Sequence, residues 1–315
     1  MTGHIQVGNH RVVVVREIAQ GGFGIVMLVR DVNDNKLYAM KQMFCQSREQ
    51  ADEAHLELRT LQKFSDDPHI ITLVDYASLP ASKGQHAQVL LLFPFYSAGT
   101  AWDMVAQAVE AAEGGDGEGL AARTGQHHWP FPERAAVATL LGTARALRAM
   151  HDEGVAHRDL KPHNILISET FSPVIMDLGS VGPARVEIKN RMQALKAEDE
   201  ASCKCSAPYR APELMQISNE CVIDGKIDVW SLGCTAYCLA FGNSPFETPK
   251  EGVLKLAILN ARYSVPAKNR NMSGFVYSEG YIELVHSMLR LNPAERPDMD
   301  DIVQQCKALL DTLPV

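Results

Sequence analysis

The sequence predicts an α+β fold in two lobes, a small antiparallel β lobe with one key helix followed by a larger, mainly helical lobe. Three observations predict it. β-branched runs separated by turn residues fill the first third of the chain, one amphipathic helix interrupts them, and apolar residues recur at helical spacing from about Ala101 onward. A length of 315 residues suits two such lobes, with a hinge near Phe93–Gly99.

Composition restricts the classes of protein that the chain can belong to. Hydrophobic residues make up 46% and charged residues 22%, which is ordinary for a globular protein. The formal net charge of −8 gives no basic footprint, so we expect no nucleic-acid partner. The seven cysteines are scattered and odd in number, which favours reduced thiols and a cytoplasmic location. No apolar run is long enough to predict a transmembrane helix.

The small lobe is predicted from runs of strand-forming residues. Turn residues separate the first runs from one another, which favours antiparallel hairpins. The predicted strands are Val12–Val15, Ile25–Val29, Leu37–Gln42, a strand near Ile70–Tyr76 and a strand near Gln88–Phe95.

One helix interrupts these strands. Ser47, followed three residues later by Gln50, predicts a capping box at its start. Ala54, Leu58 and Leu61 then repeat at helical spacing and predict the face that packs against the strands.

A carboxylate on that apolar face requires a partner. Glu57 falls on the same side of the helix, where an unpaired charge would be costly to bury. Lys41 ends the run Tyr38–Lys41 and, by itself, reads as a solvated edge residue. An ion pair between Lys41 and Glu57 would satisfy the carboxylate and hold the ammonium group toward the phosphates of a nucleotide.

A glycine-rich segment, Ala19–Val26, lies between the first two predicted strands. Glycines there let backbone N–H groups approach phosphate oxygens, because no Cβ intervenes. The simpler interpretation is a glycine-rich hairpin turn. Since no helix follows the segment, a Rossmann or P-loop site is disfavoured.

Helical spacing dominates the larger lobe. Val137–Leu147 predicts an amphipathic helix after Pro132, Asp228–Cys234 opens a helix apolar nearly all round, and Ile302–Leu310 predicts a last amphipathic helix. The Gly-rich, acidic and polar stretch 110–131, which includes His127-His128-Trp129, is interpreted as a flexible surface loop.

The strongest chemical signal is the stretch His157–Asn164. Asp159, Lys161 and Asn164 place a base, a cation and an oxygen ligand on one short loop. Asp177-Leu178-Gly179 follows a strand-like run, and Ala211-Pro212-Glu213 follows a further loop. Taken alone, the residues of His157–Asn164 could form a polar turn with no chemical role. The order of the three motifs along the chain favours a phosphoryl-transfer site.

These motifs resemble those of the eukaryotic protein kinases over essentially the whole chain. The segments Val174–Ser180, Tyr209–Glu213, Cys221–Asp224 and Asp228–Cys234, with the hinge Leu91–Tyr96, resemble the numb-associated kinase family. The resemblance implies a bilobal protein-kinase fold and transfer of phosphate from ATP, with Mg²⁺, to serine and threonine hydroxyls of proteins, by a monomer. It implies an N-terminal extension at 1–10 and a kinase domain at 11–312, divided into lobes at 11–97 and 98–312.

The resemblance also assigns roles. It implies Asp159 as catalytic base, Lys161 as the cation beside the γ-phosphate, and Asn164 and Asp177 as Mg²⁺ ligands. It implies nucleotide contacts for Ala19, Gln20, Gly21, Gly22, Phe23, Gly24, Val26, Ala39, Lys41, Glu57 and Phe95. Activation-segment roles fall to Ser202, Ser206 and Glu213, and structural roles to His157, Arg158, Asp228 and Arg296. The resemblance implies that Glu213 and Arg296 form a buried ion pair of the large lobe and that Asp228 is a helix-capping carboxylate beneath the catalytic loop.

The sequence departs from the family pattern at three positions. Ala19 replaces the first glycine of the nucleotide loop, and Leu178 replaces a phenylalanine while staying large and apolar. The family includes members linked by N-terminal acylation to membranes of the secretory pathway. Thr2 replaces the glycine that N-myristoylation needs, so we do not carry this anchor over. The resemblance leaves peripheral association with secretory-pathway membranes by another route open.

Two alternatives to an active protein kinase stay open. A pseudokinase scaffold is supported only by Ala19, and a lipid or small-molecule kinase is disfavoured by Ser206 and Ala211–Glu213.

The segment before Glu213 holds further candidate residues. Cys203 and Cys205 form a metal or redox pair or, as favoured, two reduced thiols. Glu198–Glu200 reads as a solvated acidic turn in a loop, and Ser202 and Ser206 as candidate autophosphorylation sites.

Overall fold

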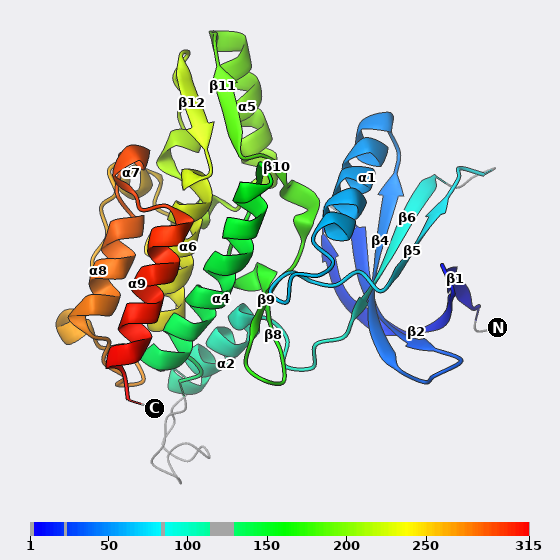
Figure 1. Cartoon of the computed structure of the whole chain (residues 1–315), viewed down its shortest axis with the longest axis horizontal. Coiled ribbons are helices and arrows are strands. Elements are labelled where there is room, and N and C mark those ends of the chain that lie inside the picture. Colours follow the sequence, from blue (N-terminus) through cyan, green and yellow to red (C-terminus); the bar gives the residue numbers. More distant parts are fainter. Residues whose placement is uncertain (1–2, 22–23, 83–85, 114–128, 315) are drawn as a thin grey trace. The chain divides into compact units, whose positions relative to one another are not determined.

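The computed structural model describes residues 3–21, 24–82, 86–113 and 129–314 (Figure 1). These residues form two compact units. The first comprises Met1–Ser97 with Met176–Gly179, and the second comprises Ala98–Ile175 with Ser180–Val315. The first unit is built on a β-sheet and the second mainly on helices, which confirms the predicted α+β fold.

The first unit is a six-stranded antiparallel sheet with the strand order β1-β2-β3-β4-β6-β5. Its strands are β1 (Ile5–Val7), β2 (His10–Gly21), β3 (Gly24–Asp31), β4 (Leu37–Cys45), β5 (Asp75–Leu79) and β6 (Ala87–Pro94).

Two details of the sheet differ from the prediction. β1 pairs with β2, so Ile5–Val7 are part of the sheet although the sequence analysis assigned them to an extension. The predicted position of a strand near Ile70–Tyr76 is wrong, because the strand runs from Asp75 to Leu79. Ile70 and Ile71 are buried at 1% and 4% exposure in the irregular segment before it, so their apolar character reports burial rather than extended structure.

Helix α1 (Arg48–Lys63) begins at the predicted residue. The Ser47 hydroxyl accepts a hydrogen bond from Gln50 N. The predicted capping box is only half formed, because the Gln50 side chain accepts from Gln46 N instead of from Ser47 N. Ala54, Leu58 and Leu61 are buried as expected.

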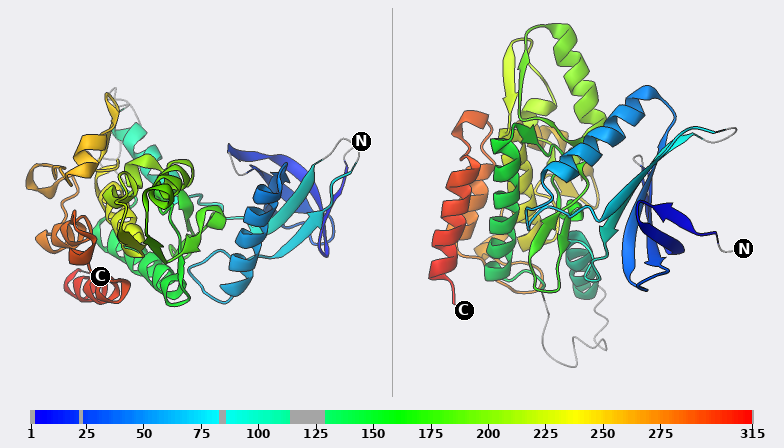
Figure 2. Two further views of the ribbon diagram at one scale, coloured as in Figure 1. Left: turned by 90° about the horizontal axis from the view of Figure 1, so that it is seen from above. Right: turned by 45° about the vertical axis from the view of Figure 1, so that its right-hand side comes forward.

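The sheet has two differently occupied faces. Alternating residues of a strand point to opposite faces, so Met40 and Lys41 of β4 must diverge. Met40 joins an apolar cluster with Val12, Val29 and Leu90. Lys41 lies on the opposite face, where it contacts Glu57 of α1. Helix α1 packs against this face of the sheet (Figure 2). One strand thus supplies both a core side chain and the cation that pairs with Glu57.

The second unit is organised around α4 and α6, which are largely buried. Its helices are α2 (Ala101–Glu113), α4 (Glu133–Asp152), α5 (Arg191–Lys204), α6 (Lys226–Phe241), α7 (Lys255–Leu259), α8 (Glu279–Met288) and α9 (Met299–Thr312). Short strands pair as β7 (Val155–Ala156) with β10 (Gly182–Pro183), β8 (Ile165–Ile167) with β9 (Pro173–Ile175), β11 (Arg185–Ile188) with β12 (Cys221–Asp224), and β13 (Glu247–Thr248) with β14 (Gly252–Val253).

The prediction of a flexible loop at 110–131 is partly wrong. Helix α2 continues to Glu113. At the other end, Trp129 and Phe131 are 3% and 0% exposed, and Trp129 Nε1 donates to Leu239 O of α6 at 2.9 Å. These aromatic side chains anchor the start of α4. His127 and His128 lie outside the described residues.

The segment between Asp177 and Glu213 is also more ordered than predicted. The expected loop contains the strand β11, which pairs with β12, and the helix α5. Asn190 caps α5 by accepting from Gln193 N. In Figure 1 the helix and the two strands extend together beyond the ends of α4 and α6.

Candidate functional site

The glycine-rich hairpin joins β2 to β3. Gly24 has φ of +131°, and a Cβ there would lie 2.1 Å from Gln42 O, so only glycine fits. The register places Ala19 opposite Val26 and Val26 opposite Lys41, side by side on adjacent strands. Gln20 pairs with Ile25, whereas Gly22 and Phe23 lie outside the described residues.

Lys41 is the centre of a charge cluster within the first unit. Its Nζ donates to Glu57 Oε1 at 2.7 Å, to Glu57 Oε2 at 2.9 Å and to Asp177 Oδ1 at 2.8 Å. Burial alone would lower the pKa of Lys41, but the two carboxylates outweigh it and raise that pKa above its usual range. Lys41 is therefore a permanent cation, and the predicted Lys41–Glu57 pair is present.

A cavity of about 270 Å³ lies between the glycine hairpin, the end of β4 and α1. Gln20, Gly21, Gly24 and Glu57 are among its lining residues. The remaining nucleotide candidates that the structure describes do not line this cavity. They are Ala19, Val26, Ala39, Lys41 and Phe95, and Ala39 lies in register with Leu28 and Phe93.

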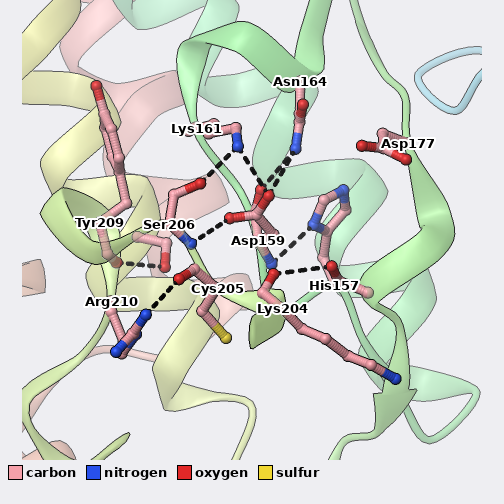
Figure 3. Close-up of polar contacts among 12 residues, drawn as sticks. His157, Asp159, Lys161, Asn164, Asp177, Lys204, Cys205, Ser206, Tyr209 and Arg210 are labelled. Atoms are coloured by element: carbon pink, nitrogen blue, oxygen red, sulfur yellow. Dashed lines mark hydrogen bonds and ion pairs between the residues drawn. The ribbon is translucent and has the colours of Figure 1, made fainter. Parts of the chain in front are cut away.

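In the second unit, Asp159 accepts hydrogen bonds from several residues and lies in the loop between β7 and β8 (Figure 3). Its Oδ2 accepts from Lys161 Nζ at 2.9 Å, and its Oδ1 accepts from Ser206 N at 2.7 Å. Asn164 Nδ2 donates to Asp159 O at 2.8 Å. The side chain is only 7% exposed, so the loop holds a carboxylate in one defined orientation.

Asp228 fixes the backbone of this loop from beneath. The carboxylate is fully buried and accepts from His157 N, from Arg158 N and from His151 Nε2, each at 2.8 Å. Burial would raise the pKa of Asp228, but these donors and the neighbouring histidines lower it instead. Arg158 has φ of +70°, a costly conformation immediately before Asp159 that the two backbone bonds stabilise.

These bonds place Asp228 against the loop that holds Asp159, as the resemblance implied, but Asp228 does not cap its own helix. The N-cap of α6 is Gly225, and Asp228 lies within the first turn. Its carboxylate caps the loop backbone rather than its own helix. His151, which the sequence analysis did not single out, is its third partner.

His163 has unusual surroundings. Its ring stacks on Trp102 of α2, with centroids 4.5 Å apart and planes at 17°. Its Nδ1 is buried and has no hydrogen-bond partner among the described residues. Burial, aided by the charge of Lys161, lowers the pKa of His163 from 6.5 to about 4. The imidazole is therefore neutral near pH 7.

We expect His163→Phe to reduce the loss of stability on acidification. Because the pKa of His163 is depressed in the folded chain, its contribution is complete above the unfolded value of 6.5 and lost as pH falls toward about 4. Allowing for its partial exposure, the difference is about 1–2 kcal/mol. Urea unfolding at about pH 7.5 and about pH 5 measures it. An equal acid-induced loss in both proteins would contradict the expectation.

The segment that precedes Glu213 contacts the loop that holds Asp159 and Lys161. Lys161 Nζ donates to Ser206 Oγ at 2.5 Å. Ser180 Oγ donates to Lys204 O at 2.9 Å, a link that the sequence analysis did not predict. Ser202, by contrast, is exposed, and Arg210 donates to its Oγ at 3.4 Å and to its backbone carbonyl at 3.3 Å.

The acidic stretch Glu198–Glu200 is not a solvated turn. It belongs to α5, and Glu198 accepts from Ile217 N at 2.9 Å. Glu200 pairs with Arg158 Nη1 at 3.3 Å, and Arg158 Nη2 donates to Pro183 O at 3.0 Å. The residue before Asp159 is thus tied both to α5 and to β10.

Glu213 and Arg296 form the expected buried pair, bidentate at 2.6 and 2.8 Å. Cys203 is exposed and Cys205 is buried, and both are free thiols. Burial raises the pKa of Cys205 to about 12, so this thiol is unreactive. Within the described part of the chain, no three His, Cys, Asp or Glu side chains are grouped to hold a metal ion.

No helix among the described residues combines the length and apolar character needed to cross a membrane.

The chain is similar in sequence to a known protein family and to several known proteins. Residues 12–306 match the family described as "Protein kinase domain". Serine/threonine-protein kinase 16 of Mus musculus and that of Homo sapiens are each 33% identical over 314 residues, which cover 99% of this chain and 94% of the relative. Serine/threonine-protein kinase ENV7 of Saccharomyces cerevisiae is 27% identical over 358 residues, covering 95% of this chain and 92% of the relative.

Proposed function

Because the chain belongs to the protein kinase family, we propose that it transfers the γ-phosphate of ATP to serine and threonine hydroxyls of proteins. The observation that carries the proposal is the loop in which Asp159 is held by Lys161 and by Ser206 N. The names of its relatives support the choice of serine and threonine. We propose the boundaries 11–312 for the kinase domain.

The proposed step is an in-line displacement. The substrate hydroxyl oxygen forms a bond to the γ-phosphorus, the bond from that phosphorus to the bridging oxygen breaks, and ADP leaves. Asp159 accepts the hydroxyl proton, for which its fixed orientation is suited. Lys161 supplies positive charge for the transferred oxygens, and Lys41 does so for the other phosphates.

We propose Asn164 and Asp177 as the ligands of Mg²⁺, as the resemblance implies. The amide nitrogen of Asn164 is used by Asp159, and its Oδ1 has no hydrogen-bond partner among the described residues. A carboxylate and an amide oxygen are ligands that suit Mg²⁺. Asn164 and Asp177 would hold the metal ion, which would supply positive charge to stabilise the phosphates.

The remaining nucleotide contacts are proposed from the resemblance and the sheet register. Ala19 and Val26 lie beside Lys41 across adjacent strands. The other proposed contacts are Gln20, Gly21, Gly22, Phe23, Gly24, Ala39, Glu57 and Phe95. We propose a cytoplasmic location with protein substrates as partners, supported by seven free cysteines.

An assay with radiolabelled ATP, Mg²⁺ and a generic protein substrate tests the proposed function. We expect phosphoserine and phosphothreonine without phosphotyrosine, and no labelling by Lys41→Met. Label confined to added lipid vesicles would favour a lipid kinase. Absence of label from every substrate, with ATP still bound, would favour a pseudokinase.

Glu200 supports the loop through Arg158. We expect Glu200→Gln to lower kcat by roughly threefold to tenfold with an unchanged KM for ATP, because a neutral amide binds the Arg158 guanidinium less strongly. Initial rates at varied ATP concentration measure the effect. Glu251→Gln, an exposed carboxylate in the same unit, is the matched control. Equal kcat values for the two variants would contradict the expectation.

A further inference from the structure

One face of α5 is exposed along the length of the helix. Its members, at helical spacing, are Met192, Leu195, Lys196, Asp199 and Cys203, and all are exposed. Met192 is 78% exposed and Leu195 is 43% exposed, which is unusual for large apolar side chains on one helix face.

The opposite face holds α5 on the second unit. Ala194 and Ala201 are 0% and 5% exposed, so the helix is seated through small side chains and turns its larger ones outward. Within the second unit, α5 stands at an extremity together with β11 and β12 (Figure 1). Its outward face is therefore accessible to another molecule.

The charges on this face lack partners. The side chains of Lys196 and Asp199 make no hydrogen bond or ion pair with any residue of the ranges that the structure describes. Their other helix neighbours differ in this respect, since Arg191 pairs with Glu198 and Lys204 with Glu200.

Four of the five members of this face are complementary to one another when the pattern is reversed, whereas Leu195 falls opposite Glu200. Lys196 and Asp199 are equidistant from the midpoint between Ala197 and Glu198, and so are Met192 and Cys203. A second α5 laid antiparallel across this face puts each Lys196 opposite an Asp199 and each Met192 opposite a Cys203. A two-fold axis through the midpoint generates all four contacts, as an isologous interface requires.

We propose that two copies of this chain associate through antiparallel pairing of their α5 helices. The partner of the exposed face is thus a second α5, and under this proposal the chain forms a weak dimer in place of the expected monomer. One helix face per copy is a small interface, so association depends on protein concentration. The proposal is independent of the proposed phosphoryl transfer.

Charge reversal tests the pairing in the full chain. In sedimentation equilibrium over a concentration series, Lys196→Asp and Asp199→Lys each place like charges opposite one another twice. We expect each to weaken dimerisation about tenfold or more, because both symmetric pairs are lost. An equimolar mixture of the two variants is expected to associate as tightly as the wild type, since the reversed charges again oppose each other.

The mixture separates a lost interface from a lost fold, because misfolded variants would not recover association. Kinase activity of each single variant, expected within about twofold of wild type, provides a second check on folding. A wild type that stays monomeric at every concentration, or single variants that dimerise as wild type does, would overturn the proposal. So would failure of the mixture to associate.

A cross-link tests the register. Met192→Cys places a thiol opposite the native Cys203 of the second copy. Mild oxidation with copper phenanthroline is expected to give a disulfide-linked dimer that the double variant Met192→Cys/Cys203→Ser does not form. Equal cross-linking of both variants, or of neither, would refute the antiparallel register. A linked heterologous protein in place of a second copy would also refute it.

Discussion

Asp159→Asn is expected to lower kcat for protein phosphorylation by about 10²–10⁴ while leaving the affinity for ATP within about threefold. An amide cannot accept the hydroxyl proton at pH 7. It also presents N–H donors where the carboxylate now accepts from Lys161 Nζ and from Ser206 N. One of these contacts becomes repulsive, so the substrate hydroxyl loses both its base and its alignment.

The measurement combines initial rates with an ATP titration followed by fluorescence. Asp152→Asn, an exposed carboxylate at the end of α4, is the matched control and is expected to retain wild-type rates. A kcat for Asp159→Asn within about threefold of wild type would show that Asp159 is not the base. Loss of ATP binding together with activity would indicate instead that the loop had collapsed.

The Lys41–Glu57 pair shows what local pattern can predict. Glu57 occupies a helix face otherwise made of buried apolar residues, so the amino-acid pattern alone requires a nearby cation. Strand alternation then directs Lys41 to the face that α1 covers. The approach to Asp177 is different, because it joins residues 136 positions apart and depends on the tertiary fold.

Helix α5 shows where local pattern fails. Its buried face is made of alanines and its charges are spread around the whole circumference, so the sequence lacks the apolar stripe that marks α1. The stacking of Trp102 on His163 escapes prediction for another reason. It brings together α2 and a short helical turn that neither spacing nor propensity connects.

The sequence predicts Asp228 only in part. The resemblance identified a structural carboxylate, and the residue is indeed fully buried. Its partners are backbone groups of residues 70 and 71 positions earlier in the chain. Such contacts depend on how the loop and α6 pack together, so the resemblance implied the place of the residue beneath the loop but not the individual partners of its carboxylate.

Arg296→Met is expected to lower the free energy of unfolding by about 3–5 kcal/mol, the largest stability effect that we predict. The Arg296 side chain is 0% exposed and binds both oxygens of Glu213. Its guanidinium also donates to the carbonyl oxygens of Arg290, Lys226 and Leu291. Methionine fills the space but leaves these acceptors without donors.

Glu213→Gln is expected to cost less than Arg296→Met, because Gln keeps an oxygen that accepts from Arg296 and the Glu213 side chain is 20% exposed. The double variant Arg296→Met/Glu213→Leu removes both charges, so its cost is expected to be smaller than the sum of the separate losses. Lysine at position 296 cannot restore the bidentate geometry.

Urea unfolding followed by tryptophan fluorescence measures these differences. Trp230 is a suitable reporter because its ring lies 5.0 Å from the Arg296 guanidinium carbon. Arg148→Met, which removes an exposed pair with Asp300, is the matched control, and we expect it to change stability by less than about 1 kcal/mol. The Arg296 pair differs from the Arg148 pair in its burial, its bidentate geometry and its three backbone acceptors. Equal losses at positions 296 and 148 would mean that these differences do not determine the cost of breaking an arginine–carboxylate pair.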